Sequence, residues 1–226
     1  MNRPIFIFLV ILVPVLGFGL ALLGIITLST NMMGGFLILA GLAYAVGVIV
    51  VFWQKRDKFW TAKTGEEFSA EEKNDLSFWF ILPGMITCFF LSPVEFLLIE
   101  EIIQRTKIFQ ITGLCLVFSG VILFLWARNH LKENYTGHLS IKTKQPLITT
   151  GPYRFIRHPG YASFILIALG VSLAYSSLIG IVAVPVLIVP GLLFRIHREE
   201  DLLQNHFGQE FKEYAARTKR LIPGVW

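Results

Sequence analysis

Two charged residues at the end of an apolar stretch have the types and the spacing of a small polar site. Arg195 and Glu199 stand four residues apart, directly after the apolar segment Leu178–Phe194. Residues four apart share one face of a helix. A planar guanidinium can grip an anionic ligand through two hydrogen bonds, and a carboxylate suits a cationic group. The other interpretation is a surface ion pair worth roughly a few tenths of a kcal/mol. Glu200 and Asp201 are expected on other faces, in solvent.

A second polar cluster, residues 157–161 (RHPGY), precedes the apolar segment Tyr161–Tyr175. Proline keeps the residue before it out of the helical region and suits the first helical turn. This predicts His158 at the cap position of a helix that Pro159 opens. The N-terminus of a helix favours an anionic group. The alternative is a basic interfacial turn, with Tyr161 among the aromatic side chains at the membrane surface.

A short connection should bring these two clusters together. Only Ser176 and Ser177 separate the segments Tyr161–Tyr175 and Leu178–Phe194, which predicts a tight antiparallel helical hairpin. The start of the first helix then lies beside the end of the second. The sequence therefore predicts one polar pocket built by His158–Tyr161 together with Arg195–Glu199.

The elements that carry these residues are membrane helices. The chain has 226 residues, of which 54% are hydrophobic and only 15% charged, with a mean hydropathy of +0.65. An ordinary soluble domain has about 25% charged residues. A helix needs roughly 20 apolar residues to cross a bilayer. We predict an all-α, polytopic helical bundle of about six spans, from the apolar stretches Ile5–Leu28, Phe36–Trp53, Leu76–Leu91, Ile108–Ala127, Tyr161–Tyr175 and Leu178–Phe194.

The basic residues are distributed unevenly between the two sides of such a bundle. Six spans place the N-terminus, Gln54–Asp75, Arg128–Gly160 and the C-terminal tail on one side, with 18 of the 20 Lys and Arg residues. Basic loops stay in the cytoplasm. The predicted site is therefore cytoplasmic, on a plasma or inner membrane in a prokaryote, or on the endoplasmic reticulum in a eukaryote. The net charge of +5 then follows from topology and indicates no nucleic-acid partner.

Several other polar residues are expected to have no chemical role. Cys88 and Cys115 lie within apolar stretches, which predicts buried thiols, with neither a disulfide framework nor a metal site. Glu95, Glu100 and Glu101 are expected at the interface opposite the polar site.

A resemblance to a known family names a reaction. The segment 147–161 (LITTGPYRFIRHPGY), Glu199-Glu200 and the segment 206–214 (HFGQEFKEY) resemble the two-part motif of the isoprenylcysteine carboxyl methyltransferase family. The similarity covers roughly Gln145–Pro223. It implies an integral membrane methyltransferase that uses S-adenosyl-L-methionine, whose cofactor site is made of C-terminal helical elements.

The resemblance also implies roles for individual residues. The substrate-carboxylate arginine of the family falls on Arg195, which with Glu199 forms the predicted catalytic pair. His138 lies near one further cofactor contact. The other cofactor contacts fall on Gln145, Pro146, Leu147, Ile148, Tyr153, His158, Pro159, Gly160, Tyr161 and Glu199.

Two regions are expected: transmembrane helices over residues 1–127, and a methyltransferase region over residues 128–226.

A carboxylate acceptor, with a pKa of ~3.5, is ionised at neutral pH and needs no general base. Catalysis then consists of proximity and orientation. Arg195 would hold the carboxylate and Glu199 the cofactor's ammonium, while a lipophilic substrate enters from the bilayer.

Other functions are compatible with the same residues. A phospholipid N-methyltransferase would need an acid–base group, for which Glu199 or His158 is available. A thiol S-methyltransferase is a third possibility within the superfamily. From another class, a membrane reductase using NADPH would resemble this C-terminal architecture. A non-enzymatic membrane protein or transporter is the remaining alternative. Against it, no ionisable residue lies in the middle of a predicted span, where transport pathways usually show such residues.

Overall fold

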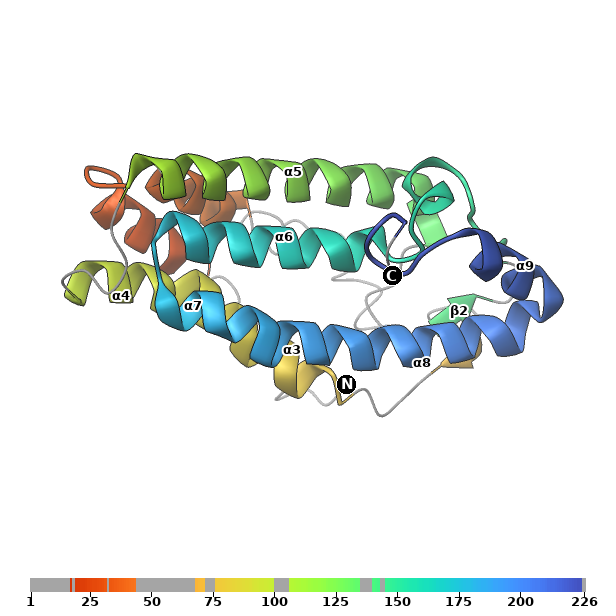
Figure 1. Cartoon of the computed structure of the whole chain (residues 1–226). Helices are drawn as coiled ribbons and strands as arrows, with labels where there is room; N and C mark the ends of the chain where they lie inside the picture. Colours follow the sequence, from red (N-terminus) through yellow and green to blue (C-terminus); the bar gives the residue numbers. More distant parts are fainter. Residues whose placement is uncertain are drawn as a thin grey trace, which may run out of the picture.

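The protein is a bundle of long helices. The computed structural model describes residue 17 and residues 19–31, 33–43, 68–71, 76–99, 106–134, 140–142 and 145–224. Figure 1 shows α5, α6 and the joined α7 and α8 running along the bundle, with α9 at the end that carries the C-terminus. The principal helices are α3 (Phe78–Ile86), α4 (Ser92–Leu98), α5 (Lys107–Leu131), α6 (Pro159–Ala174), α7 (Leu178–Ala183), α8 (Val189–Phe207) and α9 (Gln209–Arg217).

In the part of the chain that the structure describes, three helical segments are long and apolar enough to cross a membrane: Trp79–Leu98, Lys107–Leu131 and Leu178–Phe207. Met33–Ala43 and Pro159–Ala174 are shorter apolar helices. The helical membrane bundle is thus confirmed, while the count of six spans stays a prediction. The 30-residue segment Leu178–Phe207 measures about 45 Å at 1.5 Å per residue, against a hydrocarbon core of roughly 30 Å. Its second half can therefore extend beyond the bilayer.

Glycines bring α5 and α6 into close contact. A Cβ atom on Gly113 would lie 2.5 Å from the carbonyl oxygen of Gly170, and one on Gly120 would lie 2.7 Å from the Ile167 side chain. Small residues allow the backbones of two membrane helices to come into direct contact. Val117, between the two glycines, is fully buried together with Val171. This contact fixes α5 against the helix that begins at His158.

Two of the long helices contain π-helical turns. The turn Thr87–Leu91 (η1) joins α3 to α4, and the turn Val184–Ile188 (η4), which contains Pro185, joins α7 to α8. Buried side chains of both turns, Cys88 and Ile188, belong to one apolar cluster. The two irregular turns thus pack in the same part of the bundle.

The expected hairpin forms at the end of the bundle opposite α9. Ser176 adopts a φ of +51°, and the Ser177 side chain accepts a hydrogen bond from the Gly180 N–H at the start of α7. The carboxylate of Glu95 accepts hydrogen bonds from the Ser177 hydroxyl and, at 3.2 Å, from the Leu178 N–H. Glu95 is buried at this end of the bundle, where its carboxylate satisfies orphan donors of α7. Its position at the membrane interface opposite the polar site stays a prediction. Glu100 and Glu101 lie outside the described residues.

Within the described residues, a small strand pair accompanies the helices. The strand β1 (Phe68–Glu71) pairs antiparallel with β2 (Ser140–Lys142), so the structure is not purely helical. Two short 3₁₀ turns, Lys132–Asn134 (η2) and Gly151–Arg154 (η3), lie on either side of β2 in sequence. The strand pair ties parts of two predicted cytoplasmic loops to each other.

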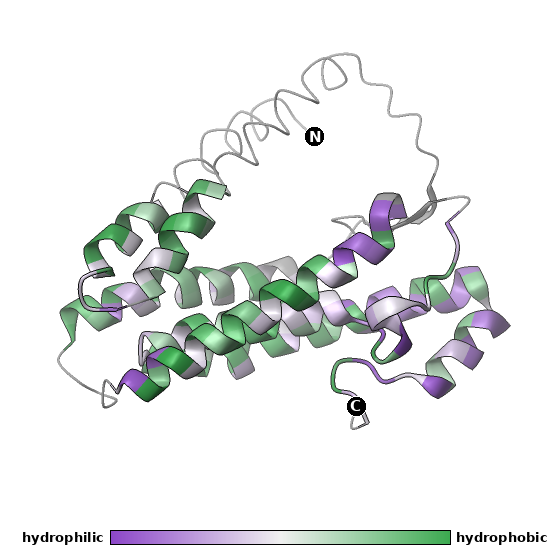
Figure 2. Ribbon diagram, turned by 90° about the horizontal axis from the view of Figure 1, so that it is seen from above, coloured by the Kyte–Doolittle hydropathy of each residue, from purple (hydrophilic) through white to green (hydrophobic). Residues whose placement is uncertain are grey.

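Apolar side chains cover the outside of the bundle, as a lipid solvent requires. Trp79, Ile108 and Ile122 are between 65% and 71% exposed. Cys88 is buried as predicted, but Cys115 is exposed, because it lies on an outward face of α5. Figure 2 shows hydrophilic ribbon concentrated at the end of the bundle that carries the C-terminus.

Candidate active site

A cavity of about 340 Å³ lies at the polar end of the bundle. Its wall is formed by residues of five helices, α3, α5, α6, α8 and α9, and by the segment 145–148. Its lining is largely apolar, with a few charged groups. The lining residues are Ile81, Met85, Phe124, Ala127, Arg128, Leu131, Asn134, Gln145, Pro146, Leu147, Ile148, Tyr153, Arg157, His158, Pro159, Gly160, Tyr161, Phe164, Leu192, Arg195, Glu199, Leu202, Leu203, Phe207, Phe211 and Tyr214.

The start of α6 forms as the sequence predicts. His158 occupies the cap position and Pro159 the first helical residue. The His158 side chain makes no capping hydrogen bond, and the residue is only 4% exposed. The ring instead stacks on Tyr161, with the two centroids 5.6 Å apart. The imidazole therefore belongs to the cavity wall.

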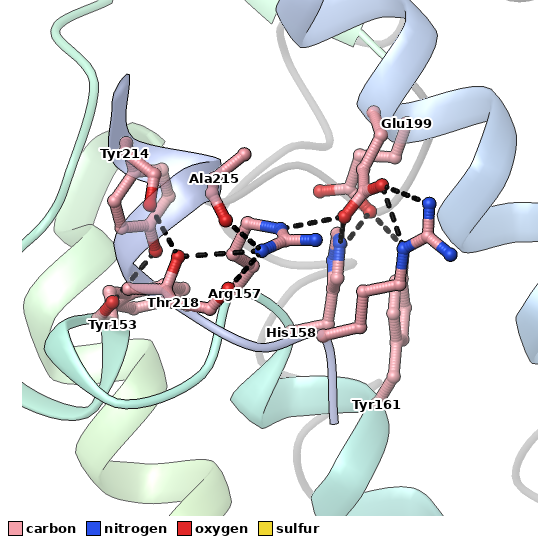
Figure 3. Close-up of polar contacts among 10 residues, drawn as sticks. Tyr153, Arg157, His158, Tyr161, Glu199, Tyr214, Ala215 and Thr218 are labelled. Atoms are coloured by element: carbon pink, nitrogen blue, oxygen red, sulfur yellow. Dashed lines mark hydrogen bonds and ion pairs between the residues drawn. The ribbon is translucent and has the colours of Figure 1, made fainter. Parts of the chain in front are cut away.

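Tyr161 links the two charged residues of the predicted catalytic pair. Its hydroxyl donates to Glu199 Oε2 at 2.6 Å and accepts from Arg195 Nε at 2.9 Å. The Arg195 guanidinium also lies over the Tyr161 ring, 6.0 Å from the centroid. Figure 3 shows Tyr161, His158 and Glu199 converging from α6 and α8. The arrangement orders a cation, a hydroxyl and a carboxylate along one side of the cavity.

Glu200 departs from the sequence-based expectation of a solvated side chain. It is 9% exposed, and Arg157 Nε donates to its Oε1 at 2.7 Å. Arg220 Nε donates to Oε2 at 2.9 Å, and His158 Nε2 lies 3.2 Å from Oε1. The cause is the C-terminal segment, which folds back over this face of α8. Asp201 is exposed, as predicted.

The C-terminal segment closes the back of the site. The backbone N–H groups of Arg157 and His158 donate to the carbonyl oxygens of Lys219 and Arg220, at 2.7 and 3.0 Å. The Arg157 guanidinium donates to the carbonyl oxygens of Ala215 and Thr218 (Figure 3). The tail is therefore tied to the RHPGY segment through both backbone and side chains.

Tyr214 holds the 3₁₀ turn η3 against α9. Its hydroxyl donates to the Tyr153 carbonyl oxygen at 2.8 Å. Burial raises the pKa of Tyr214 to about 12, so the hydroxyl stays a donor at any physiological pH. Both aromatic residues line the cavity.

All the residues predicted for the site in the described part of the chain meet at this one cavity. They are Gln145, Pro146, Leu147, Ile148, Tyr153, His158, Pro159, Gly160, Tyr161, Arg195 and Glu199. His138 lies outside the described residues. The sequence prediction missed Arg157, Phe207 and Phe211, although the last two stand within or beside the second half of the motif. It also missed residues of the first predicted region, such as Ile81 and Phe124.

Among the described residues, no group of three or more His, Cys, Asp or Glu side chains is placed to hold a metal ion. The polar groups of the cavity include an arginine, a tyrosine hydroxyl and a carboxylate in one hydrogen-bonded chain.

Comparison with known proteins identifies relatives of this region. The isoprenylcysteine carboxyl methyltransferase family matches residues 111–205. A probable protein-S-isoprenylcysteine O-methyltransferase of Oryza sativa is 31% identical over 115 residues, which make up 50% of this chain and 60% of that protein. Protein-S-isoprenylcysteine O-methyltransferase B of Arabidopsis thaliana is 30% identical over 115 residues, 50% of this chain and 58% of the relative. The chain thus spans about three-fifths of the length of these relatives.

The fold also has a counterpart among solved structures. The eukaryotic intramembrane Ras methyltransferase ICMT superposes with a TM-score of 0.54 at 21% sequence identity, covering 85% of this chain and 66% of that one. At this identity the likeness concerns the fold. Together these similarities confirm that the chain resembles the isoprenylcysteine carboxyl methyltransferase family, most directly over residues 111–205, which contain most of the α6–α8 hairpin and most of the residues that line the cavity.

Proposed function

We propose that this chain is an integral membrane methyltransferase that uses S-adenosyl-L-methionine to methylate the carboxylate of a lipophilic acceptor, such as a C-terminal S-isoprenylcysteine. The observation that carries the proposal is the chain Arg195–Tyr161–Glu199 on the wall of a mostly apolar cavity. It offers a cation for an anionic acceptor and a carboxylate for a cationic donor, connected by one hydroxyl.

The residues of the cavity fit the proposed cofactor. Glu199 is partly accessible, with 35% of its side chain exposed, so its carboxylate can meet an ammonium group. In the described part of the chain, the backbone N–H groups of Leu147 and Ile148 have no hydrogen-bond partner, and they are suitable donors for a ligand's heterocycle. Apolar side chains such as Phe207 and Leu203 supply a surface for an adenine ring. When bound, S-adenosylmethionine supplies an electrophilic methyl group on a sulfonium.

Arg195 is the residue we assign to the acceptor. Its Nε–H donates to the Tyr161 hydroxyl, which fixes the plane of the guanidinium. A guanidinium held in this way can present a carboxylate in one orientation, which is the main requirement when the nucleophile is already ionised. No residue has to remove a proton from such an acceptor.

The charge of the acceptor changes during the reaction, and this favours release of the product. A carboxylate beside Arg195 forms a charge-assisted pair. Methylation converts the carboxylate into a neutral ester, which is a weaker partner for the guanidinium. The residue that orients the substrate therefore binds the product less strongly.

The apolar part of the cavity suits a lipid chain. Ile81 and Met85 come from α3, Phe164 from α6 and Leu192 from α8. All four lie on segments of the apolar bundle, whose outer surface is itself apolar. A lipophilic acceptor would thus reach Arg195 from the bilayer side, whereas the polar cofactor would enter from water.

We further propose that the cavity faces the cytoplasm. The support is the clustering of 18 of 20 basic residues on one side of the six-span arrangement. The pairing of β1 with β2 joins parts of two of these basic loops, which agrees with their lying on one side.

The test is a methyl-transfer assay on the full chain in lipid nanodiscs with a methyl-labelled donor. The acceptors are an S-farnesylcysteine with a free carboxylate, the same molecule with the carboxylate blocked as an amide, phosphatidylethanolamine and an alkyl thiol. The proposal expects label only in the free carboxylate. Label in the phospholipid or the thiol would assign the chain to an N- or S-methyltransferase. Binding of NADPH without binding of S-adenosylhomocysteine would indicate a reductase.

A further inference from the structure

We propose that Glu200 is a positioning residue for this site, one that acts through His158. It holds the imidazole in the orientation in which the ring forms the wall of the cavity beside Glu199. The proposal rests on the proposed function, because the group positioned is one that we assign to the cofactor. It also gives a role to a buried carboxylate that the chemistry itself does not use.

The contacts of the His158 ring carry the proposal. Its Nε2 lies 3.2 Å from Glu200 Oε1, whereas its Nδ1 lies 3.7 Å from Glu199 Oε2, beyond hydrogen-bonding distance. The ring makes no capping bond to α6, and in the described part of the chain it has no polar contact besides these two carboxylates. Glu200 therefore supplies the one hydrogen bond that sets the rotation of the ring.

Burial makes this orientation strict. The His158 side chain is 3% exposed and the Glu200 side chain 11%. Stacking on Tyr161 leaves the ring plane fixed, so the choice that remains is which nitrogen faces which carboxylate. A hydrogen bond in a poorly solvated place is costly to lose, because water does not replace the missing partner. The Glu200 contact settles that choice.

The two oxygens of Glu200 have separate partners, which makes the positioning role testable. Oε2 accepts from Arg220 of the C-terminal tail, whereas Oε1 is shared by His158 and Arg157. Arg220 does not line the cavity. A substitution of Arg220 thus disturbs the link to the tail without removing the contact to the ring.

The experiment is a double-mutant cycle on the full chain in nanodiscs. The dissociation constant of S-adenosylhomocysteine is measured by calorimetry for the wild type, E200Q, H158A and the double variant, together with each melting temperature. We expect E200Q to weaken binding about tenfold when His158 is present, and less than twofold in the H158A background, as for residues within one hydrogen-bond network. The melting temperature should fall with E200Q in both backgrounds, because the ion pairs of Arg157 and Arg220 with residue 200 lose their negative charge in both.

The control is R220Q, which should lower the melting temperature while changing the dissociation constant less than twofold. Equal losses of affinity from E200Q in both backgrounds would overturn the proposal, as would a loss in R220Q as large as that in E200Q. If E200Q does not fold, E200D, which keeps the charge but shortens the side chain, takes its place in the cycle under the same criteria. A wild type that does not bind S-adenosylhomocysteine would refute the proposed function as well, so the two failures are distinguishable.

Discussion

Glu199 and Glu200 follow each other in α8, yet their carboxylates meet different nitrogens of one histidine ring. Glu199 Oε2 lies 3.7 Å from His158 Nδ1, and Glu200 Oε1 lies 3.2 Å from His158 Nε2. The Glu199 side chain lines the cavity and is 35% exposed, whereas the Glu200 side chain is 11% exposed and paired with two arginines. A pair of identical residues is thereby divided into a ligand-facing group and a structural one.

The ligand-facing carboxylate gives the first prediction. E199Q replaces a charge-assisted contact to the cofactor's ammonium with a neutral one, which should cost on the order of 1 kcal/mol or more, or roughly fivefold in affinity. Calorimetry with S-adenosylhomocysteine measures the change. D201N is the matched control, because Asp201 is an exposed carboxylate of the same helix, and its affinity should equal that of the wild type. Unchanged affinity in folded E199Q would remove Glu199 from the site.

The second prediction separates the classes of acceptor. R195K keeps the positive charge but loses both the planar fork and the Nε that donates to Tyr161, so a carboxylate acceptor should lose most turnover. Binding of S-adenosylhomocysteine should change little. R198K, on an exposed arginine nearby, is the control and should keep full turnover. A mild effect of R195K would favour an amine or thiol acceptor.

A surface ion pair is the competing interpretation of Arg195 and Glu199. In that case R195K and E199Q would each cost only about a few tenths of a kcal/mol of stability and leave turnover intact. Equal and small effects in both variants would therefore exclude the active-site assignment.

The third prediction concerns the bridging hydroxyl. Y161F keeps the ring stacked on His158 but removes the group shared by Arg195 and Glu199. Hydrogen bonds to charged groups contribute about 1.5–3 kcal/mol, so turnover should fall about tenfold or more. Y175F, which removes a buried hydroxyl bonded to Thr27 at the opposite end of the bundle, should lower the melting temperature but not the turnover per folded molecule. Equal turnover in the two variants would contradict the bridging role.

The fourth prediction is topological. With Cys88 and Cys115 replaced by alanine, single cysteines introduced by T61C and K142C should react with an impermeant thiol reagent from the same side of the membrane. The reason is the charge asymmetry of the loops, together with the pairing of residues 68–71 with 140–142. Labelling from opposite sides would refute the arrangement of six spans.

The fifth prediction compares two glycines close to the cavity. Gly151 has a φ of +61°, and a Cβ there would lie 2.3 Å from the His130 ring, so G151A should destabilise the chain by about 1–2 kcal/mol. Gly160 lies in the first turn of α6, and no atom lies within 4 Å of the position that a Cβ would take there, so G160A should leave the melting temperature unchanged or slightly higher. Thermal unfolding followed by tryptophan fluorescence measures both. Equal melting temperatures would show that the turn at Gly151 tolerates a side chain.

Much of the site follows from the sequence because it depends on a short connection. Two serines between apolar segments force a hairpin, and the hairpin brings His158 beside Arg195 and Glu199. The proline after His158 likewise sets the start of α6. Local chemistry and loop length determine these features, so a single sequence is sufficient to predict them.

The burial of Glu200 depends on contacts that no local pattern encodes. Its partners, Arg157 and Arg220, are 43 and 20 residues away in the chain, and they meet only because the tail returns to the RHPGY segment. Without the tail in place, the polar neighbours of Glu200 in sequence indicate a solvated helix face. The role of Tyr161 as a bridge is hidden for the same reason, because it needs the relative rotation of α6 and α8.

That rotation is influenced by the π-helical turn η4 at Val184–Ile188. A π-turn accommodates about one more residue than an α-helical turn, so everything after it is displaced around the helix axis by roughly 100°. A helical wheel that treats the segment from Leu178 onward as one regular α-helix would therefore place Arg195 and Glu199 on the wrong face of the helix. The irregular turn therefore rotates the second half of the helix relative to the first. The half before the turn faces the apolar core, and the half after it directs Arg195 and Glu199 toward the start of α6.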